Sequence, residues 1–113
     1  MQRSADAFLG LPYDISMYGL LLEMLAKGAG LKAGELIGQL GDCHLYNNHL
    51  EQAEVYLSRA NRAFPQLELE RGIIISDPLS VAPNYLDIPH KFEIKLNNYN
   101  PYAAIKAELS VGK

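Results

Sequence analysis

The run Gln2-Arg3-Ser4-Ala5-Asp6-Ala7-Phe8-Leu9-Gly10-Leu11-Pro12-Tyr13-Asp14 places a guanidinium, a hydroxyl and two carboxylates immediately before a strongly apolar segment. That segment, 15–26, carries leucine or methionine on nearly every face of a helix, which is typical of a helix with neighbours all round. Ser16 and Glu23 interrupt it, and it is well short of the roughly 20 residues that a bilayer-spanning helix needs. The sequence therefore predicts a buried helix at the centre of a folded domain, not a membrane span.

A strand is predicted after this helix. Gly34 breaks the helical pattern, and the segment 35–40 is typical of a strand in which Gly38 would allow another backbone to approach closely. The strand would deliver to one end of a sheet the side chains of Asp42, Cys43, His44 and Tyr46. Because residues two apart on an extended chain point the same way, His44 and Tyr46 could together hold a polar ligand such as a sugar hydroxyl.

The second half of the chain alternates between helix and strand signals. Apolar positions at helical spacing predict a second helix over 49–61. Polar and apolar residues alternate over 66–70 and 92–96, as they do in half-exposed strands. The proline-rich stretch 76–89 predicts an irregular surface connection. This order of elements predicts a single α+β domain over 1–113.

Composition narrows the classes of protein to be considered. The chain has 113 residues, 49% of them hydrophobic, which is enough for one domain with a modest core. The net charge is −3 and the ten basic residues are scattered, so neither DNA nor a membrane surface is an expected partner. The single cysteine, Cys43, excludes an internal disulfide, and no secretory leader is recognised, so we expect a cytoplasmic protein.

The polar residues of the opening run have more than one possible role. Arg3 and Ser4 could bind one phosphate group, since a guanidinium and a hydroxyl both donate to an oxyanion, but a solvated or salt-bridged Arg3 is the commoner case. Asp6 could equally form a local turn or a helix cap. Asp14 directly precedes the apolar segment, where a carboxylate would cap free backbone N–H groups of a helix.

Metal binding and cysteine chemistry are weaker alternatives. His44 and His49 span a predicted junction between strand and helix, so their imidazoles would not share one helical face as metal ligands. Cys43 and His44 are adjacent on a strand, so their side chains would point to opposite faces and would not form a thiolate–imidazolium pair. The sequence assigns no metal site and no catalytic residue.

Four blocks taken together resemble the C-terminal portion of thymidylate synthase. They are Gln-Arg-Ser-Ala-Asp at 2–6, Phe-Leu-Gly-Leu-Pro-Tyr at 8–13, Gly-Asp-Cys-His-Leu-Tyr-Asn-Asn-His at 41–49 and Ala-Ile-Lys-Ala at 104–107. The resemblance covers the chain apart from the stretch 76–89. It implies an α+β fold, with helices packed on a mostly antiparallel or mixed sheet that meets its twin in a homodimer.

The resemblance also implies a nucleotide-binding role for several of these residues. Arg3 and Ser4 would bind the phosphate of a pyrimidine nucleotide. His44 and Tyr46 would bind the 3′-hydroxyl of its deoxyribose. Because the family's phosphate site also draws arginines from the partner subunit, Arg3 would act within a dimer.

On the folate side, Asp6 would bind the pterin ring of 5,10-methylenetetrahydrofolate, and Gly10 would lie against that ring. The family's nucleophilic cysteine belongs to an upstream Pro-Cys-His block that has no counterpart in this chain, and Cys43 stands at a different place. The resemblance therefore implies a piece of a longer or split enzyme, inactive by itself.

Asp14 stands where the synthases carry asparagine. An amide can accept from uracil N3–H while it donates to O4, whereas a carboxylate would set one oxygen against O4. Cytosine presents an N4 amino donor that suits a carboxylate, given one shared proton at N3. Aspartate at this position is similar to that of the deoxycytidylate hydroxymethylases of the same superfamily.

Three functions remain open from the sequence. In the first, the chain is part of a folate-dependent methyltransferase that converts dUMP to dTMP in nucleotide biosynthesis. In the second, it is part of a dCMP (or CMP) hydroxymethylase, as Asp14 suggests. The third is a non-catalytic dimerising remnant that lacks the nucleophile.

Overall fold

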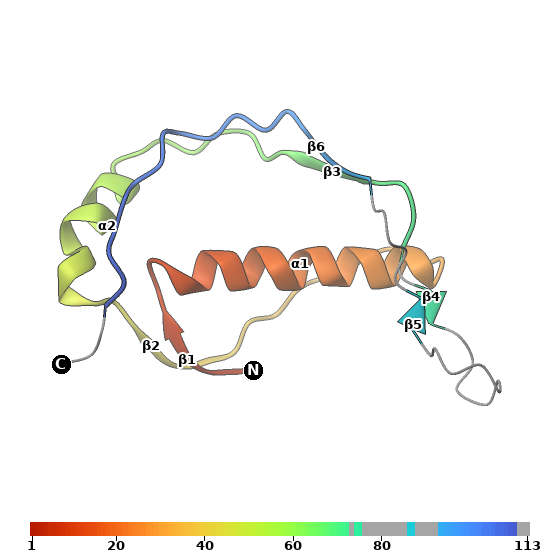
Figure 1. Cartoon of the computed structure of the whole chain (residues 1–113), viewed down its shortest axis with the longest axis horizontal. Helices are drawn as coiled ribbons and strands as arrows, with labels where there is room; N and C mark the ends of the chain where they lie inside the picture. The colour runs from red at the N-terminus through yellow and green to blue at the C-terminus, as the bar shows by residue number, and fades with distance from the viewer. Residues whose placement is uncertain (73, 76–85, 88–92, 111–113) are drawn as a thin grey trace. The chain divides into compact units, whose positions relative to one another are not determined.

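A computed structural model describes residues 1–72, 74–75, 86–87 and 93–110 of the chain (Figure 1). Its elements in chain order are β1 (Gln2–Asp6), α1 (Gly10–Gly28), β2 (Leu40–His44), the short 3₁₀ helix η1 (Asn47–His49), α2 (Leu50–Leu57), β3 (Gln66–Leu69), β4 (Ile74–Ile75), β5 (Leu86–Asp87) and β6 (Ile94–Asn97). The strands pair as β1–β2, β3–β6 and β4–β5. Mixed helices and small sheets support the predicted α+β class.

The chain forms two compact units, each with its own contacts. The first consists of Met1–Met17, Ile37–Ala63 and Asn100–Lys113, and the second of Tyr18–Leu36 and Phe64–Tyr99. That residues 1–113 act as a single domain stays a prediction. Across the described ranges, no helix has both the length and the apolar character needed to cross a membrane.

A parallel strand pair organises the first unit. β1 and β2 lie side by side with Ser4 opposite Asp42 and Asp6 opposite His44. The prediction of a strand over 35–40 was wrong in its limits, because β2 begins at Leu40 and contains the polar residues that were expected to follow it. Hydrogen bonding to β1 decides where the strand runs, and that partner lies far away in the sequence.

Close approach of the two strands depends on a different glycine from the one predicted. A Cβ atom built on Gly41 would lie 2.7 Å from the carbonyl oxygen of Arg3, nearer than such contacts occur. Gly38 has nothing within 4 Å of the corresponding position, so the role predicted for it was wrong. Gly41 is the residue that lets β1 and β2 pair.

α1 begins earlier than the apolar pattern suggested. It starts at Gly10, so Asp14 lies inside the helix and the prediction that it caps the helix was wrong. Asp6 supplies the local turn instead: its Oδ1 accepts hydrogen bonds from the backbone N–H groups of Phe8 at 3.0 Å and Leu9 at 3.3 Å. This confirms the turn-forming reading of Asp6.

The far end of α1 closes as glycine-terminated helices commonly do. The backbone N–H of Leu31 donates to the carbonyl of Ala26 at 2.8 Å, and Gly30 adopts a φ of 67°. This left-handed conformation costs a glycine little, because it has no Cβ.

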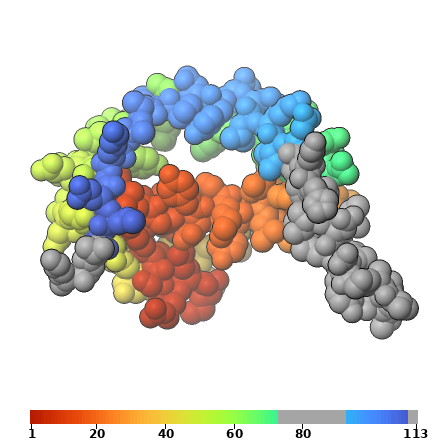
Figure 2. All heavy atoms as spheres, in the orientation of Figure 1, coloured from red at the N-terminus to blue at the C-terminus, as the bar shows by residue number. Residues whose placement is uncertain are grey.

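The apolar faces of α1 are not covered within the described part of the chain, where none of its residues is buried. Tyr13 is 78% exposed and Met17 55%, and side chains of α1 form part of the visible surface (Figure 2). The described residues bury only Ala5 and Leu69 as apolar side chains. Within the described residues the predictions of a buried helix and of a modest core were therefore wrong, because a helix that is apolar all round needs neighbours on every side.

The predicted helix over 49–61 is shorter and has two parts, η1 and α2. It ends at Leu57, and Ser58 follows, with its Oγ donating to the carbonyl of Val55 at 2.7 Å. Serine competes in this way with the backbone for helical carbonyls, which favours helix ends. The 3₁₀ helix η1 precedes α2 and begins directly after Tyr46, whose backbone is extended.

The second unit contains the predicted pair of half-exposed strands. β3 and β6 pair antiparallel, with Leu67 opposite Leu96 and Glu68 opposite Lys95, so the strands predicted over 66–70 and 92–96 are confirmed apart from their ends. In the same unit, Lys27 Nζ on α1 donates to the carbonyl of Leu69.

The irregular connection predicted over 76–89 lies mostly outside the described residues. Its described part, Leu86–Asp87, is the short strand β5, which pairs antiparallel with β4. Strand was not predicted there, and the correction reflects a pairing partner that no local pattern reveals.

Candidate functional site

All seven residues predicted to bind nucleotide or folate belong to the first unit. β1 carries Arg3, Ser4 and Asp6, α1 carries Gly10 and Asp14, β2 ends at His44, and Tyr46 follows it. Side chains on one face of a strand recur every second residue, and paired residues of neighbouring strands share a face. Ser4 and Asp6 therefore lie on the same face as their partners Asp42 and His44.

The two residues predicted to bind folate are neighbours. A Cβ atom built on Gly10 would lie 3.4 Å from the Cβ of Asp6, so the bare backbone of Gly10 lies against the aspartate. One carboxylate oxygen of Asp6 is engaged by the turn that precedes α1. The turn thus fixes the orientation of the carboxylate next to a position that has no side chain.

The two residues predicted to bind a sugar hydroxyl are in contact with each other. The rings of His44 and Tyr46 meet edge to face, with their centroids 4.8 Å apart. Nδ1 of His44 lies 3.3 Å from Oδ1 of Asp42 and 3.3 Å from its backbone oxygen. If Nδ1 donates to Asp42, a neutral imidazole presents Nε2 as an acceptor for a ligand hydroxyl.

Arg3 and Ser4 are less simply arranged. They occupy successive positions of β1, Arg3 exposed and Ser4 half-buried. Because successive side chains of a strand leave the sheet on opposite faces, a single phosphate would contact both only beside the edge of β1. The structure brings Ser4, but not Arg3, onto the face that carries Asp6.

Asp14 is oriented by a residue that the sequence did not single out. Nε2 of Gln2 donates to Oδ2 of Asp14 at 2.7 Å, and both residues are partly buried. Gln2 stands two positions before Ser4 on β1. The two-residue spacing of Gln2, Ser4 and Asp6 was the available sign that all three side chains lie on one face of the strand. Asp42 and His49 were likewise missed as partners of the predicted ligands.

Cys43 lies on β2 opposite Ala5, in the position directly before His44. Its thiol is free and exposed. Consecutive strand positions face opposite ways, as predicted for this pair. Among the residues that the structure describes, no three His, Cys, Asp or Glu side chains converge as a metal site requires.

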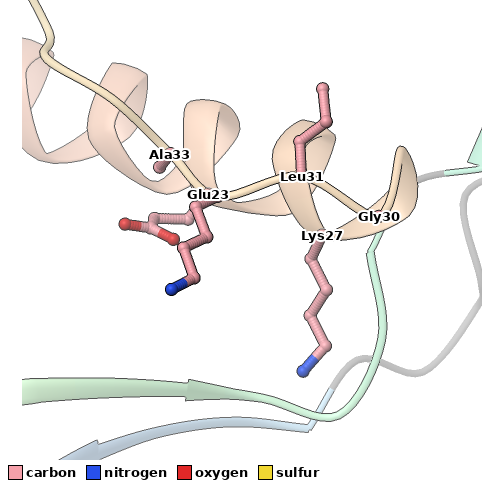
Figure 3. Close-up of a pocket in the computed structure, with 6 residues that line it drawn as sticks. Glu23, Lys27, Gly30, Leu31 and Ala33 are labelled. Carbon is pink, nitrogen blue, oxygen red and sulfur yellow. The ribbon is translucent and has the colours of Figure 1, made fainter.

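A pocket in the second unit is separate from the set of predicted ligands. It has a volume of about 480 Å³ and is lined by Glu23, Lys27, Gly30, Leu31, Lys32 and Ala33 (Figure 3). None of the seven predicted nucleotide or folate ligands lines it. The candidate site is therefore the face of β1 and β2 beside the start of α1, not this pocket.

The chain matches known proteins over a range that includes all seven predicted ligands. The sequence model of the family described as thymidylate synthase matches residues 1–111. Thymidylate synthases of Coxiella burnetii strains Dugway 5J108-111, RSA 331 / Henzerling II and RSA 493 / Nine Mile phase I are each 46% identical over 111 residues. These alignments cover 97% of this chain and 38% of each relative, so the chain spans well under half of their length. The chain belongs to the thymidylate synthase family.

Proposed function

We propose that this chain supplies nucleotide-binding and folate-binding residues to an enzyme that transfers a one-carbon unit to C5 of a pyrimidine deoxynucleotide, converting dUMP to dTMP. The pairing of Asp6 with His44 carries the proposal, because it sets a predicted folate ligand beside a predicted deoxyribose ligand on one face of β1 and β2. Membership of the family supports the same reading.

The nucleotide would be held at its two ends. Ser4 donates its hydroxyl to the phosphate, and Arg3 neutralises the phosphate from the edge of β1. His44 accepts a hydrogen bond from the 3′-hydroxyl through Nε2 while Asp42 orients the ring through Nδ1. The edge-to-face contact with His44 holds the ring of Tyr46, whose phenol reaches the same hydroxyl.

The donor set at Asp6 fits a pterin. A carboxylate accepts from adjacent N–H donors of an aminopyrimidinone ring, and the turn to Phe8 and Leu9 fixes its direction. Gly10 leaves open the space that a side chain would fill beside it. When bound, 5,10-methylenetetrahydrofolate supplies the one-carbon unit, and the chain's own residues orient the ring.

No residue of this chain is proposed as the nucleophile that attacks C6 of the base. Cys43 stands beside Ala5, on the face opposite to His44. We infer that the complete activity needs residues outside this chain, including those of a second subunit in a homodimer. The single cysteine favours a reducing compartment, so the cytoplasm is the proposed location.

A titration tests this proposal directly. The isotopically labelled chain is titrated with dUMP and, in parallel, with dCMP, while NMR follows the backbone amides of Arg3, Asp14, His44 and Tyr46. Selective shifts with dUMP support the synthase reading. Silence with both nucleotides from a folded chain would mean that the nucleotide site forms only together with the residues outside this chain.

The contact between Gln2 and Asp14 favours hydroxymethylation of dCMP (or CMP) as a second candidate. An amide N–H donated to Oδ2 keeps Asp14 an acceptor, which matches the N4 amino donor of cytosine. Selective shifts with dCMP in the same titration would support this function and contradict the first.

A further inference from the structure

We propose that His49 is a positioning residue that couples the C-terminal segment (residues 100–110), through Glu108, to the ring of Tyr46. The first observation is burial: His49 is 0% exposed, the one buried polar or charged residue in the described part of the chain. It lies at the end of η1, and the first unit also contains Tyr46 and Glu108. The significance of Tyr46 rests on the proposed function; the coupling itself does not.

The hydrogen bond to Glu108 fixes one form of the ring. Nε2 of His49 lies 2.6 Å from the backbone oxygen of Glu108. Because a carbonyl oxygen only accepts, Nε2 must carry the proton. Nδ1 is buried and has no hydrogen-bond partner among the described residues, so the neutral tautomer protonated at Nε2 is the one that fits.

This arrangement is hard to explain by packing alone. A buried ring nitrogen without a partner costs free energy that an apolar ring of the same shape would avoid. In return, the histidine forms a short hydrogen bond to a residue 59 positions away in the sequence. His49 is therefore suited to holding the C-terminal segment in one place.

Aromatic contacts connect this bond to the proposed nucleotide site. The ring of His49 lies between Phe8, with centroids 5.6 Å apart, and Tyr46, with centroids 6.0 Å apart. Tyr46 in turn meets His44 at 4.8 Å. The angle of 87° between His49 and Tyr46 is an edge-to-face contact, so a tilt of the imidazole moves the surface on which the phenol rests.

The C-terminal segment is held at a second place, by two arginines that follow α2. The guanidinium of Arg62 stacks 3.6 Å from the centre of the Tyr102 ring and donates to the carbonyl of Asn100 at 2.9 Å. Arg59 donates to the carbonyl of Ala103 at 2.9 Å. The segment thus runs beside α2 (Figure 1), with its far end closed by His49.

The coupling is reciprocal by thermodynamic necessity. If the bond to Glu108 favours one position of Tyr46, a ligand that favours the same position strengthens the hold on the C-terminal segment. A ligand on Tyr46 would then reduce the mobility of Glu108, although no ligand atom touches that residue.

Two substitutions separate the hydrogen bond from the packing. His49→Phe keeps an aromatic ring and removes the donor, whereas His49→Gln keeps an N–H donor at similar reach. The control is Asn48→Ala, since Asn48 is exposed and its Nδ2 reaches the same oxygen at 3.4 Å. In the complete chain without nucleotide, NMR follows the Tyr46 ring signals and the exchange of the backbone amides of Leu109 and Ser110.

We expect His49→Phe to shift the Tyr46 signals and to speed amide exchange after Glu108 about tenfold, His49→Gln to restore most of both, and Asn48→Ala to change neither. Unchanged Tyr46 signals in a folded His49→Phe chain would overturn the proposal, as would equal effects from Asn48→Ala. Deleting residues 108–113 removes the acceptor without touching His49 and is expected to shift Tyr46 in the same way. In the unmodified chain, ¹⁵N shifts that put the His49 proton on Nδ1 would overturn it whether or not the variants fold.

Nucleotide binding is measured separately. If the unmodified chain binds neither dUMP nor dCMP, a nucleotide site formed by this chain alone is excluded, while the comparison of Tyr46 signals still decides the coupling. If it binds dUMP, we expect His49→Phe to weaken that binding about tenfold and His49→Gln to recover it. Recovery by glutamine is the outcome that a purely structural role would not produce.

Discussion

Gln2 and Asp14 are joined by a hydrogen bond of 2.7 Å that links β1 to the first turns of α1. It orients the carboxylate on which the choice between uracil and cytosine is proposed to depend. The donor stands on the strand that also carries Ser4 and Asp6. The base-reading residue is therefore fixed by the same strand as the proposed phosphate and folate ligands.

Asp14→Asn is expected to shift the preference of the site from cytosine toward uracil nucleotides. A mispaired buried polar group costs about 1–3 kcal/mol, so the ratio of the two dissociation constants should change roughly tenfold or more. Calorimetric titration of the variant with dUMP and dCMP measures it. Glu51→Gln, which removes an exposed carboxylate from α2, is the control. An unchanged ratio would exclude a base-reading role for Asp14.

Gln2→Leu should lower the stability of the chain. It removes the donor and leaves a partly buried carboxylate without its partner, a loss of about 1–2 kcal/mol. The free energy of unfolding in urea is the measurement. Gln66→Leu, at an exposed strand position, should change it by less than about 0.5 kcal/mol. Equal effects of the two substitutions would mean that the hydrogen bond contributes nothing.

Gly41→Ala should separate β1 from β2. The new Cβ would lie 2.7 Å from the Arg3 carbonyl, so a strand must move, at a cost of about 1–3 kcal/mol. Gly38→Ala is the matched control, because nothing lies within 4 Å of its Cβ position. Unfolding in urea compares the two. A Gly41→Ala chain as stable as the control would contradict the close pairing.

Arg62→Lys should loosen the C-terminal segment although it preserves the charge. The flat guanidinium stacks on Tyr102 and donates to the carbonyls of both Asn100 and Pro101, which a lysine ammonium cannot reproduce together. We expect faster amide exchange over 102–107 and a loss of about 0.5–1 kcal/mol for the stacking. Lys95→Arg, on the exposed strand β6, is the control. Unchanged amide exchange in the Arg62→Lys chain would show that a positive charge at position 62 is enough to hold the C-terminal segment.

Local patterns predicted several elements because their causes are local. Alternating residues revealed β3 and β6. The separation of two positions on an extended chain predicted that His44 and Tyr46 point the same way, and the structure adds that their rings are in contact. The limits of β2 could not be predicted in this way, since they depend on pairing with β1. The burial of α1 was overestimated because its apolar pattern describes a helix with more neighbours than the described residues provide.

By itself, the sequence predicted the α+β class from the order of its elements and a turn or cap at Asp6 from residue type, and the resemblance of four sequence blocks indicated the family and seven candidate ligands. Only the tertiary structure decided that α1 begins before Asp14, that Gln2 orients this carboxylate and that His49 bonds to Glu108. The physical reason is that a hydrogen bond or a ring contact needs two groups within a few ångströms. For groups 12 and 59 positions apart, the path of the backbone between them sets that distance.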